Sequence, residues 1–334
     1  MKARIKAILK YLLFTAVAGL FLYLAFRTAD WTKMLEDFRS ADYRYVVLSM
    51  LMGYAAFVSR GLRWNLLLRP LGKSAKNWNA IHAISLGYFA NALVPRAGEV
   101  MRCTSLKETD DIPLERLFGT VVLERVIDAI ILLSLICLAF VIQLGNLQAF
   151  FDQALAGGDQ QAGSSGIDLK LVLLGIIVLV AILFLIFRKR IQALPLFAKV
   201  RQLWEGFKEG FKSLSKVENK WAFYGHTLFI WTMYFTMIYV VMFALPSTKD
   251  IGLGNGLFVM VAGGMGMVVP TPGGIGSYHY LVQLALSVLG VDKADGLTFA
   301  TLVHSGQLVM TLLAGSFAIP MVYRARRILK KSKA

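Results

Sequence analysis

Charged side chains stand beside a proline in the middle of an otherwise apolar part of the sequence. Arg96 and Glu99 follow Pro95, and Arg102 stands three residues after Glu99. An ionised side chain at the centre of a bilayer costs about 2.5–3.5 kcal/mol on insertion scales, so each charge needs a partner or a function. A helix that begins after the proline presents free N–H groups at its positive end, a ready site for an anion. We therefore predict that Arg96, with Glu99 and Arg102 beside it, binds an anionic group.

A second group of charges stands in a later apolar stretch. Glu124 and Asp128 are four residues apart and share one helix face, and Arg125 stands between them. An economical arrangement pairs Arg96 or Arg102 with these two acids. We interpret Glu124, Arg125 and Asp128 as internal struts, because buried ion pairs of this kind need no substrate.

Arg60 and Arg63 stand three residues apart near the end of the apolar stretch 44–67. They are candidates to attract a phosphate together with Arg96. The alternative is that both side chains only extend to the lipid headgroups at the membrane surface.

A glycine-rich break contributes the other candidate residues. The segment from Pro270 to Gly276 reads Pro-Thr-Pro-Gly-Gly-Ile-Gly, and such a turn lets the backbone approach a ligand closely. His279 follows it and His304 stands in a later apolar stretch. The two histidines suit a polar lining or a proton relay, and the alternative is ordinary hydrogen-bonded packing. We assign substrate binding to Gly273, Gly274, Gly276 and His279, a structural role to Pro270 and Pro272 as to Pro95, and a candidate proton relay to His279 and His304.

The sequence contains no set of nucleophile, base and metal ligands. Cys103 and Cys137 lack metal-ligand spacing. We therefore assign no catalytic residue, no metal and no cofactor, and we expect a protein that is not an enzyme. The net charge of +16 does not indicate nucleic acid, because the basic residues lie in short loops between apolar stretches.

Composition indicates a polytopic all-α membrane protein. The 334 residues are 57% hydrophobic and only 17% charged, whereas soluble domains carry about 25% charged residues. Six stretches reach roughly the 20 residues that cross a bilayer. They are 8–26, 44–67, 117–142, 168–187, 221–245 and 298–322.

Lysine and arginine between these stretches predict the orientation. The segment before 8–26, the segment 188–220 and the chain end are basic, whereas 145–168 has no Lys or Arg. The positive-inside rule then places both termini in the cytoplasm of a bacterial inner membrane. We expect a cytoplasmic amphipathic helix at about 196–217.

Two apolar stretches, about 78–106 and 253–290, are interrupted by proline and glycine. The breaks share the pattern Leu/Val-Val-Pro-x-x-Gly, around Pro95 and Pro270. We predict two re-entrant hairpins that enter from opposite faces, an inverted-repeat architecture within a single membrane domain of residues 1–334. The alternative is that both breaks are kinks in full-length helices.

Three ordered motifs resemble the lysylphosphatidylglycerol synthase transmembrane region family. The resemblance covers nearly the whole chain and implies a lipid flippase-like fold, a lipid substrate and Asn91 among the substrate-binding residues. We expect a stand-alone member without the aminoacyltransferase domain, so aminoacyl-lipid synthesis is not implied. His279 stands about where family members often carry an acidic residue, which leaves open the headgroup charge that is preferred. The motifs are Asn91-Ala92-Leu93-Val94-Pro95-Arg96-Ala97-Gly98-Glu99 with Arg102, Glu124-Arg125-x-x-Asp128, and Pro270-Thr271-Pro272-Gly273-Gly274-Ile275-Gly276.

The sequence thus predicts a lipid flippase-like transporter. Its substrate would be an anionic phospholipid or a headgroup linked to polyprenyl phosphate. Its partners would be membrane lipids rather than nucleic acid, with a dimer as the oligomer if the chain self-associates. The alternatives are a secondary transporter of a small solute or ion, a membrane enzyme acting on a lipid phosphate or glycolipid, and a scaffold.

Overall fold

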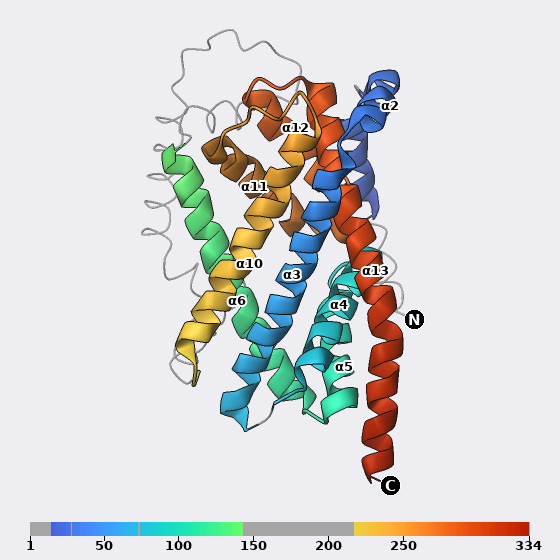
Figure 1. Cartoon of the computed structure of the whole chain (residues 1–334), viewed down its shortest axis with the longest axis vertical. Coiled ribbons are helices and arrows are strands. Elements are labelled where there is room, and N and C mark those ends of the chain that lie inside the picture. Colours follow the sequence, from blue (N-terminus) through green and yellow to red (C-terminus); the bar gives the residue numbers. More distant parts are fainter. Residues whose placement is uncertain (1–14, 28, 73, 143–216, 334) are drawn as a thin grey trace, which may run out of the picture. The chain divides into compact units, whose positions relative to one another are not determined.

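The structure is a computed structural model that describes residues 15–27, 29–72, 74–142 and 217–333, and the regular elements in these ranges are all helices (Figure 1). The predicted crossing 168–187 lies outside the described residues. Most of the predicted amphipathic helix and the start of the first predicted crossing lie outside them too. The all-α prediction is therefore confirmed over the described ranges.

The helices follow the apolar stretches of the sequence closely. A short apolar helix, Thr15–Phe26, comes first. The other α-helices are α2 (Trp31–Ser40), α3 (Tyr43–Leu68), α4 (Asn77–Leu93), α5 (Ala97–Asp110), α6 (Leu114–Ile142), α10 (Lys220–Val241), α11 (Leu253–Val268), α12 (Ser277–Val288) and α13 (Lys293–Lys333). Three short 3-10 helices are η1 (Arg69–Leu71), η2 (Met242–Ala244) and η3 (Pro272–Gly274).

Three helical stretches among the described residues are long and apolar enough to cross a membrane: Tyr43–Leu68, Lys220–Ala244 and Lys293–Ser332. They match the predicted crossings that begin at residues 44, 221 and 298. Within the most apolar window of the last stretch only 17% is buried inside the protein, as expected of a helix surrounded by lipid. At 41 residues α13 is about 60 Å long, so it extends well past the predicted crossing.

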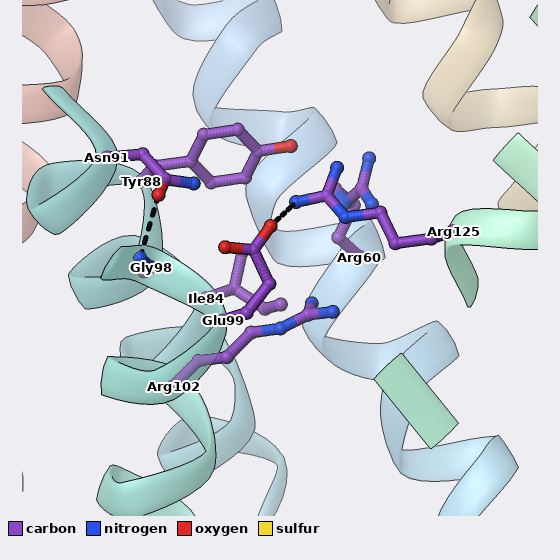
Figure 2. Close-up of a pocket in the computed structure, with 9 residues that line it drawn as sticks. Arg60, Ile84, Tyr88, Asn91, Gly98, Glu99, Arg102 and Arg125 are labelled. Carbon is purple, nitrogen blue, oxygen red and sulfur yellow. Dashed lines mark hydrogen bonds and ion pairs between the residues drawn. The ribbon is translucent and has the colours of Figure 1, made fainter. Parts of the chain in front are cut away.

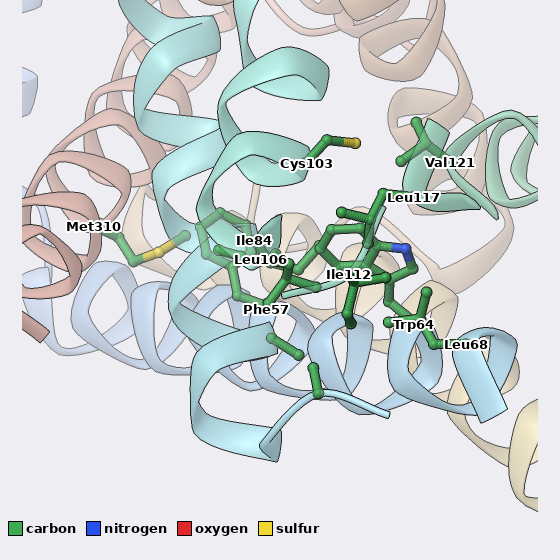
Figure 3. Packing of buried hydrophobic residues seen from close by; sticks show 13 residues of the cluster. Phe57, Trp64, Leu68, Ile84, Cys103, Leu106, Ile112, Leu117, Val121 and Met310 are labelled. Atoms are coloured by element: carbon green, nitrogen blue, oxygen red, sulfur yellow. The ribbon is translucent and has the colours of Figure 1, made fainter. Parts of the chain in front are cut away.

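The apolar core lies where α3, α4, α5 and α6 meet (Figure 3). Trp64 of α3, Ile84 of α4 and Leu106 of α5 are buried there together with Leu117 of α6. Burying such a side chain contributes about 1.5–3 kcal/mol. This cluster fixes α5 against α3 and α6, and so positions the charged residues of α5 beside those of the other two helices.

The first interrupted stretch forms a helical hairpin, which we call the first hairpin (α4, α5). Its break consists of Val94, Pro95 and Arg96, and the two helices pack against each other. They cross closely, because a Cβ added to Gly98 would lie 2.1 Å from the carbonyl oxygen of Gly87. Such packing excludes a single kinked helix at this position, since a kinked helix would continue away from its first half.

The second interrupted stretch forms the second hairpin (α11, α12). Here a Cβ added to Gly266 would lie 2.8 Å from the Tyr278 Cα. Ser277 Oγ donates to the Gly266 carbonyl at 2.8 Å and so ties the two helices together. The break contains Gly273 and Gly276 at φ of 58° and 84°, where a side chain would be strained.

The first hairpin packs against α3 and α13, whereas the second packs against α13 through α12 and against α10 and α6 through α11 (Figure 1). The η3 turn of the second hairpin contacts the end of α4. A Cβ added to Gly273 would lie 3.5 Å from the Ala92 Cα, which is ordinary van der Waals contact. The second break therefore touches the end of α4 just before the first break, although about 180 residues separate the two in the sequence.

Candidate functional site

Ionised side chains from three helices form a buried charge cluster (Arg60, Arg63, Arg102, Glu124 and Asp128). Arg60 Nη2 pairs with Glu124 and also with Asp128 Oδ2 at 2.6 Å. Arg63 Nη2 lies 2.8 Å from Asp128 Oδ1 and 3.2 Å from Glu124 Oε1. Removing one partner from such a buried network typically costs about 3–5 kcal/mol, because the charges left behind stay buried.

Arg102 completes the cluster from the first hairpin. Its Nη1 donates to Glu124 Oε2 at 2.8 Å, and its guanidinium lies 4.8 Å from the centre of the Trp64 ring. Its Nε and Nη2 are buried and have no hydrogen-bond acceptor among the described residues. Of the predicted pairing of Arg96 or Arg102 with the two acids, the part between Arg102 and Glu124 is confirmed. Asp128 pairs with Arg60 and Arg63 instead.

The buried charge cluster has three guanidinium groups and two carboxylates, so it carries one positive charge in excess. The neighbouring ion pair of Glu99 Oε1 and Arg125 Nη2, at 2.5 Å, adds no net charge. This pair is more exposed than the cluster, with 25% and 50% of the two side chains accessible. Exposed pairs contribute only about 0–1 kcal/mol.

A cavity lies beside the cluster, under the break of the first hairpin (Figure 2). About 10 Å³ of the cavity is open to the centre of a water molecule, which is room for about one water molecule. The cavity brings together four predicted substrate-binding residues, Arg60, Asn91, Glu99 and Arg102. Its lining is Arg60, Ile84, Gly87, Tyr88, Asn91, Gly98, Glu99, Arg102 and Arg125.

Arg96 lies at the break itself and does not line this cavity. It is exposed, its backbone is left-handed at φ 63°, and its guanidinium has no carboxylate partner in the described part of the chain. The N-terminus of α5 behind it is partly occupied, because Gly98 N donates to Asn91 Oδ1 at 2.7 Å. Asn91 thus caps the helix, and the anion site predicted at these N–H groups retains fewer free donors than expected.

The two arginines of α3 are buried inside the protein. Arg60 and Arg63 are 4% and 0% exposed and are held by the carboxylates of α6. The alternative that they extend to lipid headgroups is therefore wrong. Arg63 is not among the described residues that line the cavity, whereas Arg60 is. Their assignment to substrate binding stays a prediction, as does the role of Glu124, Arg125 and Asp128 as struts.

Sequence reasoning missed the tyrosines of this site. Arg60 Nη1 donates to the Tyr234 hydroxyl of α10 at 3.0 Å, and Tyr88 of α4 exchanges a hydrogen bond with Tyr234 at 3.0 Å. Tyrosine is common in apolar helices, so nothing in the local sequence distinguishes these two. Only the packing of α10 on α3 reveals them.

The second hairpin presents neutral polar groups. His304 Nε2 of α13 lies 2.9 Å from the Gly273 carbonyl oxygen, which can only accept, so Nε2 donates. His279 Nδ1 accepts from Gly276 N at 3.3 Å, and the two imidazole rings lie 4.8 Å apart. The helix Thr15–Phe26 covers them, with Phe26 in contact with His279. The proton relay stays a prediction.

The other predicted residues of the second break lie in its turn or next to it. Pro272 stands in the first turn of η3, and Gly274 is left-handed at φ 81°. Pro270 follows the end of α11. Among the described residues no group of three or more His, Cys, Asp or Glu side chains could hold a metal ion.

Helices of this length and composition, packed around interrupted hairpins, define a multi-pass membrane protein. The family model of the lysylphosphatidylglycerol synthase TM region matches residues 8–315. The chain belongs to this family, and the resemblance predicted from its motifs is confirmed.

Several known proteins resemble the chain. Glycosyltransferase AglD of Haloferax volcanii is 26% identical over 335 residues, which covers 90% of this chain and 53% of that protein. A UPF0104 membrane protein of Methanocaldococcus jannaschii is 31% identical over 104 residues, 30% of this chain and 31% of that protein. Phosphatidylglycerol lysyltransferase of Bacillus subtilis is 30% identical over 125 residues, 37% of this chain and 14% of that protein.

The chain thus spans about half the length of the Haloferax protein and less of the other two. No solved structure matches it.

Proposed function

We propose that the protein moves a lipid headgroup between the two leaflets of a membrane, along a path between the tips of its two hairpins. The observation that carries this proposal is the cavity with excess positive charge under the first break, beside the point where Ala92 meets Gly273. The charged headgroup would use this polar path while the apolar tails stay in the bilayer.

The membrane arrangement that fits this path has six crossings and two re-entrant hairpins in an inverted repeat. Irregular backbone at membrane depth must be enclosed by protein or line a wet cavity. The second break fits this condition because its η3 turn packs against the end of α4, next to the first break. The basic flanks support cytoplasmic termini in a bacterial inner membrane.

The substrate would carry a phosphate group. Arginine binds phosphate oxygens through several N–H groups at once, and Arg102 has two such groups without an acceptor among the described residues. Exposed Arg96 would attract the headgroup at the break. The name of the Bacillus subtilis relative contains phosphatidylglycerol, which favours an anionic phospholipid, and a polyprenyl phosphate-linked headgroup offers the same chemistry.

Movement of the first hairpin has to accompany transport. The cavity has room for about one water molecule, far less than a glycerophosphate headgroup needs. Because the apolar core anchors α5 at Cys103 and Leu106, the part free to move is the tip at Arg96.

A second candidate is a transferase acting on a lipid phosphate. The printed names of two relatives favour it, since one is a glycosyltransferase and the other a lysyltransferase. Against it, Glu99, Glu124 and Asp128 are all engaged in ion pairs with arginine. Group transfer from a lipid-linked donor by the purified protein would establish this candidate instead.

Leaflet exchange in proteoliposomes tests the proposal. Fluorescent phosphatidylglycerol, phosphatidylethanolamine and a short polyprenyl phosphate would be offered to the wild type and to Arg96→Ala and Arg102→Gln. Arg39→Gln, an exposed arginine of α2, is the matched control. We expect exchange of one lipid class, with a loss of about tenfold or more in Arg102→Gln and wild-type exchange in the control.

Absence of exchange for every lipid, together with uptake of a water-soluble solute into the same vesicles, would instead indicate a secondary transporter. An effect below a few-fold for Arg96→Ala would remove that residue from the site.

A further inference from the structure

The Glu99 carboxylate lies in the cavity among guanidinium groups that a larger anion would also contact. Its Oε1 accepts from Arg125 Nη2 at 2.5 Å, and Figure 2 shows the side chain directed toward Arg125. Its other oxygen, Oε2, is buried without a hydrogen-bond partner among the described residues. Glu99 therefore uses only one of its two carboxylate oxygens where it lies.

The same cavity holds more donors than Glu99 satisfies. Arg102 is 5% exposed, and its Nε and Nη2 find no acceptor in the described ranges. Arg60 Nε is buried in the same way, and both arginines line the cavity. Because a buried N–H without an acceptor is unfavourable, these groups favour an anion that presents several oxygens at once.

The Glu99–Arg125 pair is also the part of the charge network that can exchange partners. Half of the Arg125 side chain is accessible, whereas the side chains of Arg60 and Glu124 are 5% and 1% accessible. Because Arg125 is only half buried, an anion can reach its guanidinium without disturbing Arg60 or Glu124. Such an anion meets the Glu99 carboxylate there and repels it.

We propose that Glu99 is an internal substitute for the phosphate of the substrate. The phosphate of a lipid headgroup binds Arg125 and the free N–H groups of Arg102, and the Glu99 carboxylate leaves its position. Glu99 belongs to α5 and Arg125 to α6, so this exchange releases the tip of the first hairpin from α6. The pair Arg102–Glu124 still holds the rest of the hairpin. Substrate binding is thereby coupled to opening of the tip.

That the phosphate belongs to a lipid rests on the proposed function. The test therefore measures binding alone, in detergent, where no transport between leaflets is needed. Titration calorimetry of the full chain in detergent micelles would compare dihexanoyl phosphatidylglycerol, inorganic phosphate and dihexanoylglycerol, which has no phosphate. The variants are Glu99→Gln, Glu99→Ala and Arg125→Gln. Glu115→Gln removes an exposed carboxylate near the start of α6 and is the matched control.

Removing the competing carboxylate should strengthen binding. We expect Glu99→Gln and Glu99→Ala to bind phosphatidylglycerol about fivefold or more tightly than the wild type, because a like charge has gone. Arg125→Gln should bind about fivefold or more weakly, and Glu115→Gln as the wild type. If inorganic phosphate gives the same order of affinities among the variants, the phosphate group alone is the ligand. If only the lipid gives this order, its glycerol and acyl chains also contribute to binding. Either result supports the exchange, provided that dihexanoylglycerol does not bind.

Unchanged or weaker binding by both Glu99 variants would overturn the inference, since Glu99 would then be a strut or a ligand of the substrate. Binding by neither the wild type nor the Glu99 variants would overturn it as well. Leaflet exchange would still decide the proposed function in both cases.

Discussion

The two hairpins have the same helix–break–helix plan but opposite chemistry. The first contributes Arg102 to the buried charge cluster and holds Glu99 against Arg125. The second has no ion pair at its tip among the described residues and is held by Ser277, His279 and His304 through neutral hydrogen bonds. The comparison teaches that both breaks are held by close packing, whereas buried ion pairs accompany only the first among the described residues.

Glycine accounts for what the hairpins share. Gly98 in the first and Gly266 in the second let the two helices of each hairpin approach until a Cβ would meet backbone atoms. The two hairpins differ in the ion pairs that only the first one makes at its break among the described residues. The following predictions would break or sharpen this contrast, and they run from the largest expected effect to the smallest.

Glu124→Gln should have the largest effect. The substitution leaves Arg60, Arg63 and Arg102 with one carboxylate in a buried site. We expect the free energy of unfolding to fall by about 3–5 kcal/mol. Unfolding in detergent with increasing denaturant measures it, and Glu115→Gln is the control. A fall in the free energy of unfolding no larger than that of Glu115→Gln would mean that the cluster is hydrated and that the first hairpin is held by packing alone.

Gly98→Ala should have the next largest effect, because the added Cβ would lie 2.1 Å from the Gly87 carbonyl oxygen. Overpacking of this kind costs about 1–3 kcal/mol. Gly119→Ala in α6 is the control, because a Cβ there meets nothing within 4 Å and alanine is the better helix former, by about 0.5–1 kcal/mol. The midpoint temperatures of unfolding should therefore move in opposite directions. Movement in the same direction would contradict the close crossing of α4 and α5.

His304→Phe tests the second hairpin. Phenylalanine keeps a ring between Tyr278 and His279 but cannot donate to the Gly273 carbonyl. One lost neutral hydrogen bond should cost about 1 kcal/mol, well below the cost at Glu124. Thermal unfolding of the two variants side by side checks the order. An equal or larger loss at His304 would show that the second tip depends on its polar groups as strongly as the first depends on charge.

The smallest effect is expected from pH at the contact between α2 and α13. A hydrogen bond to Asp295 raises the pKa of Lys33 above its ordinary value of 10.5, against the opposing effect of burial. A raised pKa means that the charged lysine stabilises the fold below about pH 10.5 and that this contribution disappears as pH rises through the folded-state pKa. The midpoint temperature of the wild type should fall slightly more than that of Lys33→Met between pH 9 and strongly alkaline pH. An equal fall in the midpoint temperatures of the two proteins would exclude a contribution of charged Lys33 to stability.

The helices and their breaks could be predicted from the sequence because each depends on local chemistry. Apolar runs predicted α3 and α10 within a few residues, and Pro95 and Pro270 predicted both breaks. The need to pair charges in an apolar environment predicted Arg96 or Arg102 as the partner of Glu124 and Asp128, and the structure pairs Arg102 with Glu124. These signals lie within single helices or between neighbouring ones.

The remaining contacts required knowledge of which helices are neighbours. Arg60 finds Asp128 68 residues away and Tyr234 174 residues away, and no local pattern links them. The side chain of Asn91 accepts from Gly98 N, a contact that was not predicted, and its assignment to substrate binding stays a prediction. That contact depends on how tightly α4 and α5 cross, which the motif alone does not reveal.

The most direct test of the central claim is a reversible cross-link between the two tips. A Cβ at Gly273 would lie 4.0 Å from the Ala92 Cβ, within the span of a disulfide, so Ala92→Cys with Gly273→Cys should bridge when Cys137, exposed on α6, is replaced by serine. If the headgroup passes between the tips, leaflet exchange stops on oxidation and returns with reductant. Each single-cysteine protein sets the basal rate, which includes the strain of a side chain at Gly273, and does not respond to oxidation. Exchange that continues at full rate with the bridge closed would contradict the account.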